Sequence, residues 1–126
     1  MRNTLKNLAL TSALLMTTQA FATDLVCDVY LKPGAGGNTL GNGTAHCDGF
    51  DFSFSNSTTG RFYLKNISKP IQQVIWQGGA SSCSGGTQCT VTLPAYSPKT
   101  ATAIVLYDDG TYETTNLSRM YYESGF

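Results

Sequence analysis

The clearest structural signal in the chain is TATAIVLYDDGTYETTN, residues 100–116. Its first half is rich in β-branched and apolar residues, a composition typical of a central strand that is buried on both faces. Asp109 and Gly110 then predict a tight primed turn, because both residue types tolerate the positive φ that such a turn demands. Residues 111–123 supply the returning strand. We therefore predict a β-hairpin between residues 100 and 123.

Outward from this hairpin, turn residues recur every eight to twelve positions, a spacing typical of an all-β sandwich. Residues 33–43 contain five glycines and a proline, and residues 55–60 are SNSTTG, so both stretches predict loops. No stretch after residue 22 predicts a helix. With the hairpin, the alternating segments give about seven strands in a two-sheet sandwich. The segments outside the hairpin are residues 25–31, 46–54, 61–67, 71–76 and 88–93.

Alternation separates the two faces of the segment at residues 46–54. His46 and Asp48 share one face with three phenylalanines, whereas Cys47 lies on the other face. Gly49 is a candidate for a bulge that re-aims one of these sets. Asp48 and Asp51 are three positions apart, so they face opposite ways and cannot act as a simple carboxylate pair. The phenylalanines are Phe50, Phe52 and Phe54.

A family resemblance rests on three features of the second half of the chain. They are the I-x-x-V-x-W pattern of Ile71, Val74 and Trp76, the hairpin sequence, and MYYE at residues 120–123. Over residues 61–123 the chain resembles the immunoglobulin-like sandwich domains of small exported bacterial proteins, many of which have no assigned function. The resemblance implies a two-sheet fold and a display or binding role, and it carries over no catalytic residue. The chain departs from antibody-type domains because no long-range Cys…Trp…Cys spacing brackets Trp76.

The first 22 residues have the layout of a secretory signal peptide. The chain begins with basic residues, residues 8–16 form an apolar run too short to span a bilayer, and an A-x-A cleavage pattern, AFA, ends at Ala22. We predict cleavage after Ala22, which leaves residues 23–126, a chain of 104 residues that suits one domain. A buried N-terminal helix is the alternative.

The charge balance of the mature chain argues against two classes of partner. The full sequence has eight basic and eight acidic residues, and cleavage would remove Arg2 and Lys6, leaving six against eight and a formal net charge of −2. The six basic residues are scattered, so we expect neither nucleic acid nor an anionic membrane surface as a partner. No later apolar run approaches the roughly 20 residues of a membrane helix. We therefore expect no membrane insertion of the mature chain, and a location in the periplasm or outside the cell.

Four cysteines lie after residue 22, at positions Cys27, Cys47, Cys83 and Cys89. An even number in a small exported chain predicts two disulfides formed in an oxidising compartment. Sequence alone allows three pairings, but proximity favours Cys83 with Cys89, which leaves Cys27 with Cys47. Zinc is the alternative, yet there is no C-x-x-C, and the only histidine, His46, sits beside a cysteine rather than at a ligand spacing. We expect structural disulfides and no metal or other cofactor.

The second pair of cysteines lies in WQGGASSCSGGTQCTVTLPAY, residues 76–96. This stretch lacks the lysine and the following helix of a phosphate-binding loop, and it lacks the G-x-S-x-G of a nucleophile elbow. A Ser–His dyad would have to recruit His46. We therefore expect no catalytic residue, and we interpret the stretch as a loop made rigid by its disulfide, with a small hydrolase as the less favoured alternative.

Three aromatic residues, Trp76, Tyr96 and Tyr112, are candidates for a binding surface. The expected function is that of a non-catalytic binding module of inhibitor, immunity or adhesion type, which recognises a protein or another cell-surface macromolecule. The alternative is a carbohydrate-binding module whose tyrosine and tryptophan rings stack on sugars. The pair Asp108 and Asp109 suggests a calcium site, but the D-x-[DN]-x-[DN]-G loop is missing. Ion binding there, the partner and the oligomeric state stay open.

Overall fold

A computed structural model describes residues 22–125, which form nine strands and no helix. Sheet A has three antiparallel strands in the order β1-β4-β6, and sheet B has the order β2-β3-β9-β7-β5, with β8 also paired to β7. The strands of sheet A are β1 (Asp24–Tyr30), β4 (Ser57–Lys65) and β6 (Gln88–Pro94). Those of sheet B are β2 (Asn38–Leu40), β3 (His46–Asp51), β5 (Ile71–Gly78), β7 (Lys99–Tyr107), β8 (Tyr112–Thr114) and β9 (Ser118–Ser124).

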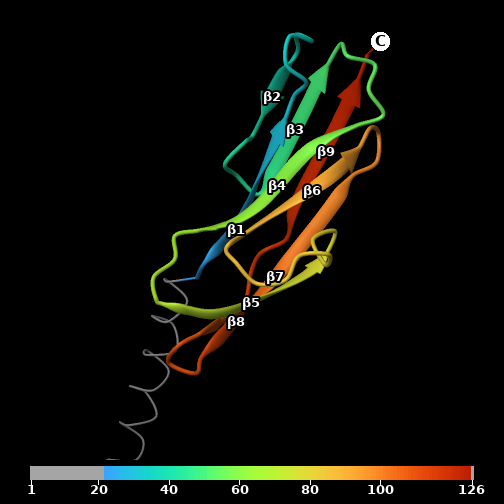
Figure 1. The fold of residues 1–126 in the computed structure, drawn as a ribbon. Helices are drawn as coiled ribbons and strands as arrows, with labels where there is room; N and C mark the ends of the chain where they lie inside the picture. The colour runs from blue at the N-terminus through green and yellow to red at the C-terminus, as the bar shows by residue number, and fades with distance from the viewer. Residues whose placement is uncertain (1–21, 126) are drawn as a thin grey trace, which may run out of the picture.

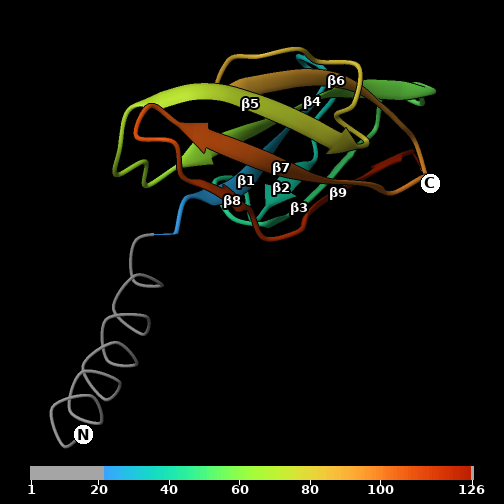
Figure 2. The same cartoon turned by 90° about the horizontal axis from the view of Figure 1, so that it is seen from below.

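The two sheets pack face to face (Figure 1), and the view in Figure 2 shows β4 and β6 in one layer with β7 and β9 in the other. The predicted all-β sandwich of two sheets is confirmed. Every strand pair is antiparallel except β3 with β9, which run parallel with His46 opposite Arg119. Apart from Ala22, the predicted signal peptide lies outside the described residues. Residues 22–125 contain no helix that could cross a membrane.

The core lies between the sheets and is built by alternation along each strand. In β6, buried Cys89, Val91 and Leu93 alternate with exposed residues. β9 contributes Met120 from the opposite layer, where this side chain is fully buried. A Cβ on Gly60 of β4 would lie 2.3 Å from Met120 Sδ, so this glycine makes room for the methionine between the layers.

The predicted hairpin between β7 and β8 is present, but its turn is of another type. Gly110 N donates to Tyr107 O at 3.0 Å, and Tyr107 N donates to Thr111 O at 2.9 Å. Gly110 has a φ of 86°, whereas Asp109 is not among the residues with positive φ. The connection is therefore a type I turn followed by a left-handed glycine that forms a G1 bulge, because only one residue needs positive φ.

Long-range pairing overrides local composition at two predicted loops. Residues 57–60 were expected to form a turn, but they begin β4, where they pair with β6 and, from Thr59 onward, with β1. Residues 38–40, inside the predicted glycine-rich loop, form β2 against β3. β7 is also less buried than predicted, since buried residues alternate with half-buried or exposed ones along its length.

The predicted returning strand at residues 111–123 is divided into β8 and β9. Thr115 lies between them and exchanges two hydrogen bonds with Ala103 of β7: its N donates to Ala103 O at 2.9 Å, and its Oγ1 accepts from Ala103 N at 3.0 Å. The register against β7 shifts by one residue between the β8 and β9 pairings. The structure therefore has nine strands instead of about seven. One additional strand comes from this division into β8 and β9, and the other is the short β2.

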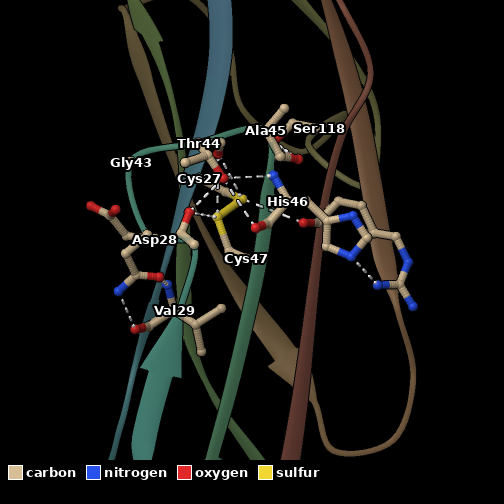
Figure 3. Close-up of a disulfide and its surroundings, with 12 residues drawn as sticks. Cys27, Asp28, Val29, Gly43, Thr44, Ala45, His46, Cys47 and Ser118 are labelled. Carbon is tan, nitrogen blue, oxygen red and sulfur yellow. Dashed lines mark hydrogen bonds between the residues drawn. A yellow bond between two sulfur atoms is a disulfide. The ribbon is translucent and has the colours of Figure 1, made fainter.

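Both predicted disulfides are confirmed. Cys27 and Cys47 are completely buried, with Cα atoms 6.0 Å apart, and they join β1 of sheet A to β3 of sheet B (Figure 3). Cys83 and Cys89 have Cα atoms 5.8 Å apart and join the β5–β6 loop to the start of β6. Two disulfides in one small domain indicate a non-reducing, extracytoplasmic environment.

Candidate binding site

Trp76, predicted as an exposed binding ring, is a core residue. It is only 4% exposed, on the same face of β5 as buried Val74. Its indole Nε1 donates to Gly85 O at 2.9 Å. The tryptophan therefore fills the core and ties the β5–β6 loop to the sandwich, and its face is not offered to a ligand.

Tyr96 and Tyr112 are both exposed, but they lie at opposite ends of sheet B. Tyr112 is 72% exposed and pairs with Leu106 near the end of β7. Tyr96 has a φ of 63°, and its hydroxyl donates to Ser124 O at 2.8 Å, next to the end of β9. Tyr96 thus fastens the last strand, and the three aromatic residues predicted as binding residues do not gather in one site.

The stapled loop at residues 79–87 is held at several points, as its sequence predicts. Gly79 N donates to Thr100 O at 2.6 Å and Cys83 N donates to Ala80 O at 3.0 Å. The Cys83–Cys89 disulfide and the indole of Trp76 fasten its second half. These contacts account for both cysteines and the tryptophan as structural groups.

A surface that the sequence did not reveal lies on the outer face of sheet B, over β2, β3 and β9. In register, Leu40 lies opposite Asp48, which lies opposite Tyr121, and Asn38 lies opposite Phe50, which lies opposite Glu123. These two cross-strand rows enclose a groove with a volume of about 350 Å³, called here the β2–β3 groove. Its lining residues are Asn38, Thr39, Leu40, Asp48, Gly49, Phe50, Tyr121 and Glu123.

Large apolar side chains are exposed in and beside the β2–β3 groove. Leu40 is 72% exposed, and Phe50 and Phe52 meet edge to face with ring centres 6.0 Å apart. Phe54 follows in the β3–β4 connection and is 71% exposed. The alternation correctly placed Phe50 on the face opposite Cys47, and this face is the outer one. The predicted strand at residues 46–54 is shorter than expected, because β3 ends at Asp51 and Phe52 and Phe54 lie in the connection that follows, where Phe54 has a φ of 57°.

A polar cluster borders the groove at His46, at the start of β3. Arg119 Nη1 donates to His46 Nε2 at 2.9 Å, which leaves the ring proton of the neutral histidine on Nδ1. Asp48 lies 3.8 Å from His46 and 3.9 Å from Arg119. Such exposed contacts contribute at most about 1 kcal/mol each. They form a solvated polar cluster on the outer face of sheet B.

Behind the groove, a fully buried carboxylate fixes the end of β3. Asp51 accepts hydrogen bonds from Lys32 N (3.1 Å), Ser53 N (3.1 Å), Ser53 Oγ (2.7 Å), the Tyr122 hydroxyl (2.8 Å) and Ser124 Oγ (3.3 Å). Burial would raise the pKa of Asp51, but these hydrogen bonds outweigh burial and hold the pKa well below its usual range. The ionised carboxylate therefore connects β3, the turn that follows it and β9.

The acidic turn considered for calcium has its carboxylate occupied by other contacts. Asp109 accepts from Thr111 N and Oγ1 at 2.9 and 2.5 Å, and from Lys69 Nζ at 3.1 Å. These hydrogen bonds, led by that of the Thr111 hydroxyl, lower the pKa of Asp109 to about 2. Within residues 22–125, no group of three or more His, Cys, Asp or Glu side chains is placed to hold a metal ion.

A second hollow, of about 450 Å³, lies beside β1 and is more open to solvent. Its wall includes Asn116, whose side chain is occupied by hydrogen bonds to the backbone of Leu25. The β2–β3 groove is the better candidate site, because large apolar side chains, those of Leu40 and Phe50, are exposed along its wall. The chain matches none of the protein-family models, curated proteins or solved structures with which it was compared.

Proposed function

We propose that this protein is an exported, non-catalytic binding module with an immunoglobulin-like sandwich fold, and that it recognises another protein through the β2–β3 groove. The supporting observation is the exposure of Leu40 and Phe50 in the groove, with Phe52 packed edge to face against Phe50 and exposed Phe54 two residues further along the chain. Scattered exposed apolar residues need no explanation, but a cluster of them is typical of an interaction surface. Aromatic residues are enriched at protein–protein interfaces, so this composition favours a protein partner.

The charges of the groove narrow the chemistry of the partner. Asp48 and Glu123 both line the groove, Asp48 opposite Tyr121 and Glu123 opposite Phe50. The side-chain carboxylate of Glu123 makes no hydrogen bond or ion pair with any other residue of the described range 22–125. A segment with an apolar side chain next to a lysine or arginine would complement both features. Together with the predicted signal peptide, the disulfides support a periplasmic or secreted protein of inhibitor, immunity or adhesion type.

Site-specific photo-crosslinking tests this proposal. A photoreactive amino acid at position 40 should give a defined adduct with one protein from periplasmic or secreted fractions, whereas the same amino acid at position 112 should give none. Tyr112 is an equally exposed position at the other end of sheet B, so it is the matched control. After identification by mass spectrometry, the purified partner should bind Glu123→Lys more weakly than wild type by about tenfold or more. Identical adducts from both positions would contradict a groove-specific partner.

A glycan is the second candidate ligand, and one observation favours it. Tyr121 lies opposite Asp48 in one row and two residues before Glu123 in β9, so its ring could stack on a sugar while the two carboxylates accept hydrogen bonds from the sugar hydroxyls. Retention of the mature protein on an insoluble polysaccharide, lost in Tyr121→Ala but kept in Tyr112→Ala, would support this alternative. The buried position of Trp76 removes one of the rings on which the sugar hypothesis first rested.

A further inference from the structure

Thr23, the residue just before β1, is held tightly by the fold. It is 2% exposed, whereas Ala22 before it is exposed. Thr23 N donates to Glu113 Oε1 at 2.6 Å, and Thr23 Oγ1 lies 2.5 Å from the Tyr107 hydroxyl oxygen. That hydroxyl donates to the same Glu113 oxygen at 2.5 Å. The end of β7 and the middle of β8 therefore hold a single carboxylate oxygen against the backbone nitrogen of Thr23.

This cluster carries a negative charge without a direct counter-ion. Burial would raise the pKa of Glu113, but hydrogen bonds from Tyr107 and Thr23 outweigh burial and lower it, so the carboxylate is ionised at neutral pH. Burial, followed by the hydrogen bond to Glu113, raises the pKa of Tyr107, which stays neutral. Lys69 Nζ lies 4.5 Å above the Tyr107 ring but pairs with Asp109. Among residues 22–125, no basic side chain forms a salt bridge with Glu113.

We propose that Glu113 and Tyr107 form a receptor for the α-ammonium group of Thr23, which is created when an export peptidase cuts after Ala22. Hydrolysis consumes one water and breaks the C–N bond between Ala22 and Thr23. The Ala22 carbonyl carbon gains the oxygen and leaves as a carboxylate, and the Thr23 nitrogen becomes a primary amine that is protonated to ammonium. The inference rests on the predicted cleavage site and is independent of the proposed binding function.

The geometry suits an ammonium group without rearrangement. An amide nitrogen offers one N–H donor and an ammonium offers three, and the existing donor already points at Glu113 Oε1. Cleavage therefore turns a neutral donor into a charged one, and charge-assisted hydrogen bonds are roughly twice as strong as neutral ones. Because Thr23 is buried, a peptidase cannot reach the bond after β1 has docked. Cleavage comes first, and the new terminus then helps to dock β1.

The ion pair has a characteristic pH dependence. Glu113 favours the charged form, so the pKa of the α-amino group in the folded chain is raised above its unfolded value of roughly 7.7–8.0. Stabilisation from a raised pKa is complete below the unfolded pKa and is lost as the pH rises through the folded pKa. The other titratable groups around Thr23 are Tyr107, Lys69 and Asp109, together with Asp24, which follows Thr23 in the chain.

The direct test is a pH titration of Thr23 by NMR in the mature, disulfide-bonded protein labelled with ¹³C-threonine. We expect the Thr23 Cα resonance of the wild type to report a pKa about one unit or more above roughly 8.0, the top of the ordinary range. Glu113→Gln should return this pKa to the ordinary range. Asp108→Asn should leave it raised, because this control removes a nearby exposed charge that makes no contact with Thr23. A wild-type Thr23 that titrates in the ordinary range would overturn the proposal.

A second experiment compares the melting temperatures of two chains whose α-ammonium groups differ in position by one residue. A chain that begins at Ala22 should melt at a temperature roughly 4 °C or more below a chain that begins at Thr23, measured at pH 7. The difference should vanish in Glu113→Gln, and equal melting temperatures in the wild-type background would contradict the proposal. If Glu113→Gln does not fold, Tyr107→Phe keeps the carboxylate, and the wild-type titration remains decisive. Mass spectrometry of the exported protein must show Thr23 as the first residue, and any other first residue would also overturn the proposal.

Discussion

The two outer strands of sheet A differ in how their free edges are completed. On β1, the side-chain amide of Asn116 donates to Leu25 O and accepts from Leu25 N, both at 2.9 Å. The amide of Asn42 binds Val29 in the same way, at 2.9 and 3.1 Å. Each asparagine thus supplies one donor and one acceptor, as a single residue of a neighbouring strand would.

Between these two asparagines, the backbone itself completes the edge of β1. Cys27 N donates to Thr44 O at 2.9 Å, and Gly43 N donates to Cys27 O at 2.8 Å. The disulfide from Cys27 to Cys47 crosses to sheet B at the same point, and Figure 3 shows Gly43 and Thr44 around it. The backbone N–H and C=O groups of Leu25, Cys27 and Val29, which point away from β4 toward the free edge of sheet A, are therefore all hydrogen-bonded.

The other outer strand, β6, is left open. Within the described residues, the backbone of β6 forms its ladder with β4 alone, and its cross-link is the short disulfide to the preceding loop. An open strand edge can pair with another chain, and exposed edges are commonly protected against this. We infer that contacts along the β1 edge contribute more to the free energy of unfolding than contacts along the β6 edge, and that they also prevent pairing with another chain. Substitutions on β6 should therefore be tolerated better than substitutions along the β1 edge.

The largest expected difference between the two sides concerns the disulfides. Replacing both Cys27 and Cys47 by alanine should lower the free energy of unfolding by about 3 kcal/mol from loop entropy alone, against about 2 kcal/mol for Cys83 and Cys89. The real difference should be larger, because Cys27 and Cys47 are completely buried. Urea denaturation of the two double variants measures it. An equal or greater loss on the Cys83–Cys89 side would contradict the comparison.

The next largest effect concerns Asp51, which accepts a hydrogen bond from Lys32 N just beyond the end of β1 and so continues the pairing along the β1 edge. Asp51→Asn should lower the free energy of unfolding by about 2 kcal/mol at pH 7, since hydrogen bonds to a charged group are lost. The folded pKa is lowered, so this contribution is present above the unfolded pKa of roughly 3.9 and is lost as the pH falls toward the folded value. Urea denaturation from pH 7 to pH 2 should therefore show a steeper loss for wild type than for Asp51→Asn. Asp48→Asn, on the outer face, should keep the wild-type profile.

A smaller effect is expected when one asparagine of the β1 edge is removed. Asn116→Ala leaves the backbone N–H and C=O of Leu25 without their partners and should lower the free energy of unfolding by about 1–2 kcal/mol. Hydrogen exchange should report faster exchange of the Leu25 amide, while amides in β6 stay unchanged. Protection of Leu25 equal to that in wild type would show that the asparagine does not substitute for a strand.

The smallest effect is expected on the open side. Thr90 and Thr92 are exposed on the outer face of β6, so Thr90→Lys and Thr92→Lys should change the free energy of unfolding by less than about 0.5 kcal/mol. Added lysines also disfavour edge-to-edge pairing, so light scattering at high protein concentration should show slower association. A stability loss comparable with that of Asn116→Ala would contradict the tolerance proposed for this side.

Local sequence signals predicted the parts of the fold that depend on near neighbours. Alternation in β6, the position of the Asp109–Gly110 turn and the pairing of Cys83 with Cys89 all follow from residues close in the chain. The parallel pairing of β3 with β9 joins residues 73 positions apart, such as His46 and Arg119, and no local pattern encodes it. The same limit explains the missed β2, since three residues become a strand only through a partner.

The candidate groove was missed for a related reason. Its rows are assembled from β2, β3 and β9, so no single stretch of sequence contains it. For Trp76, in contrast, a usable signal was present. It lies two positions from Val74, on the same side of an alternating strand, and this parity favours the core over the surface.

The order of the cysteines along the chain has a consequence for how the disulfides would form if the chain is exported as its first 22 residues predict. Each disulfide joins two cysteines that are consecutive along the sequence, Cys27 with Cys47 and Cys83 with Cys89. A chain that enters an oxidising compartment with its N-terminus first presents each pair together, so oxidation in order of arrival gives the native bonds without reshuffling. The last strand to arrive, β9, occupies the middle of sheet B. Covalent cross-linking can therefore begin early, whereas the second layer of the sandwich closes only when residues 118–124 have been delivered.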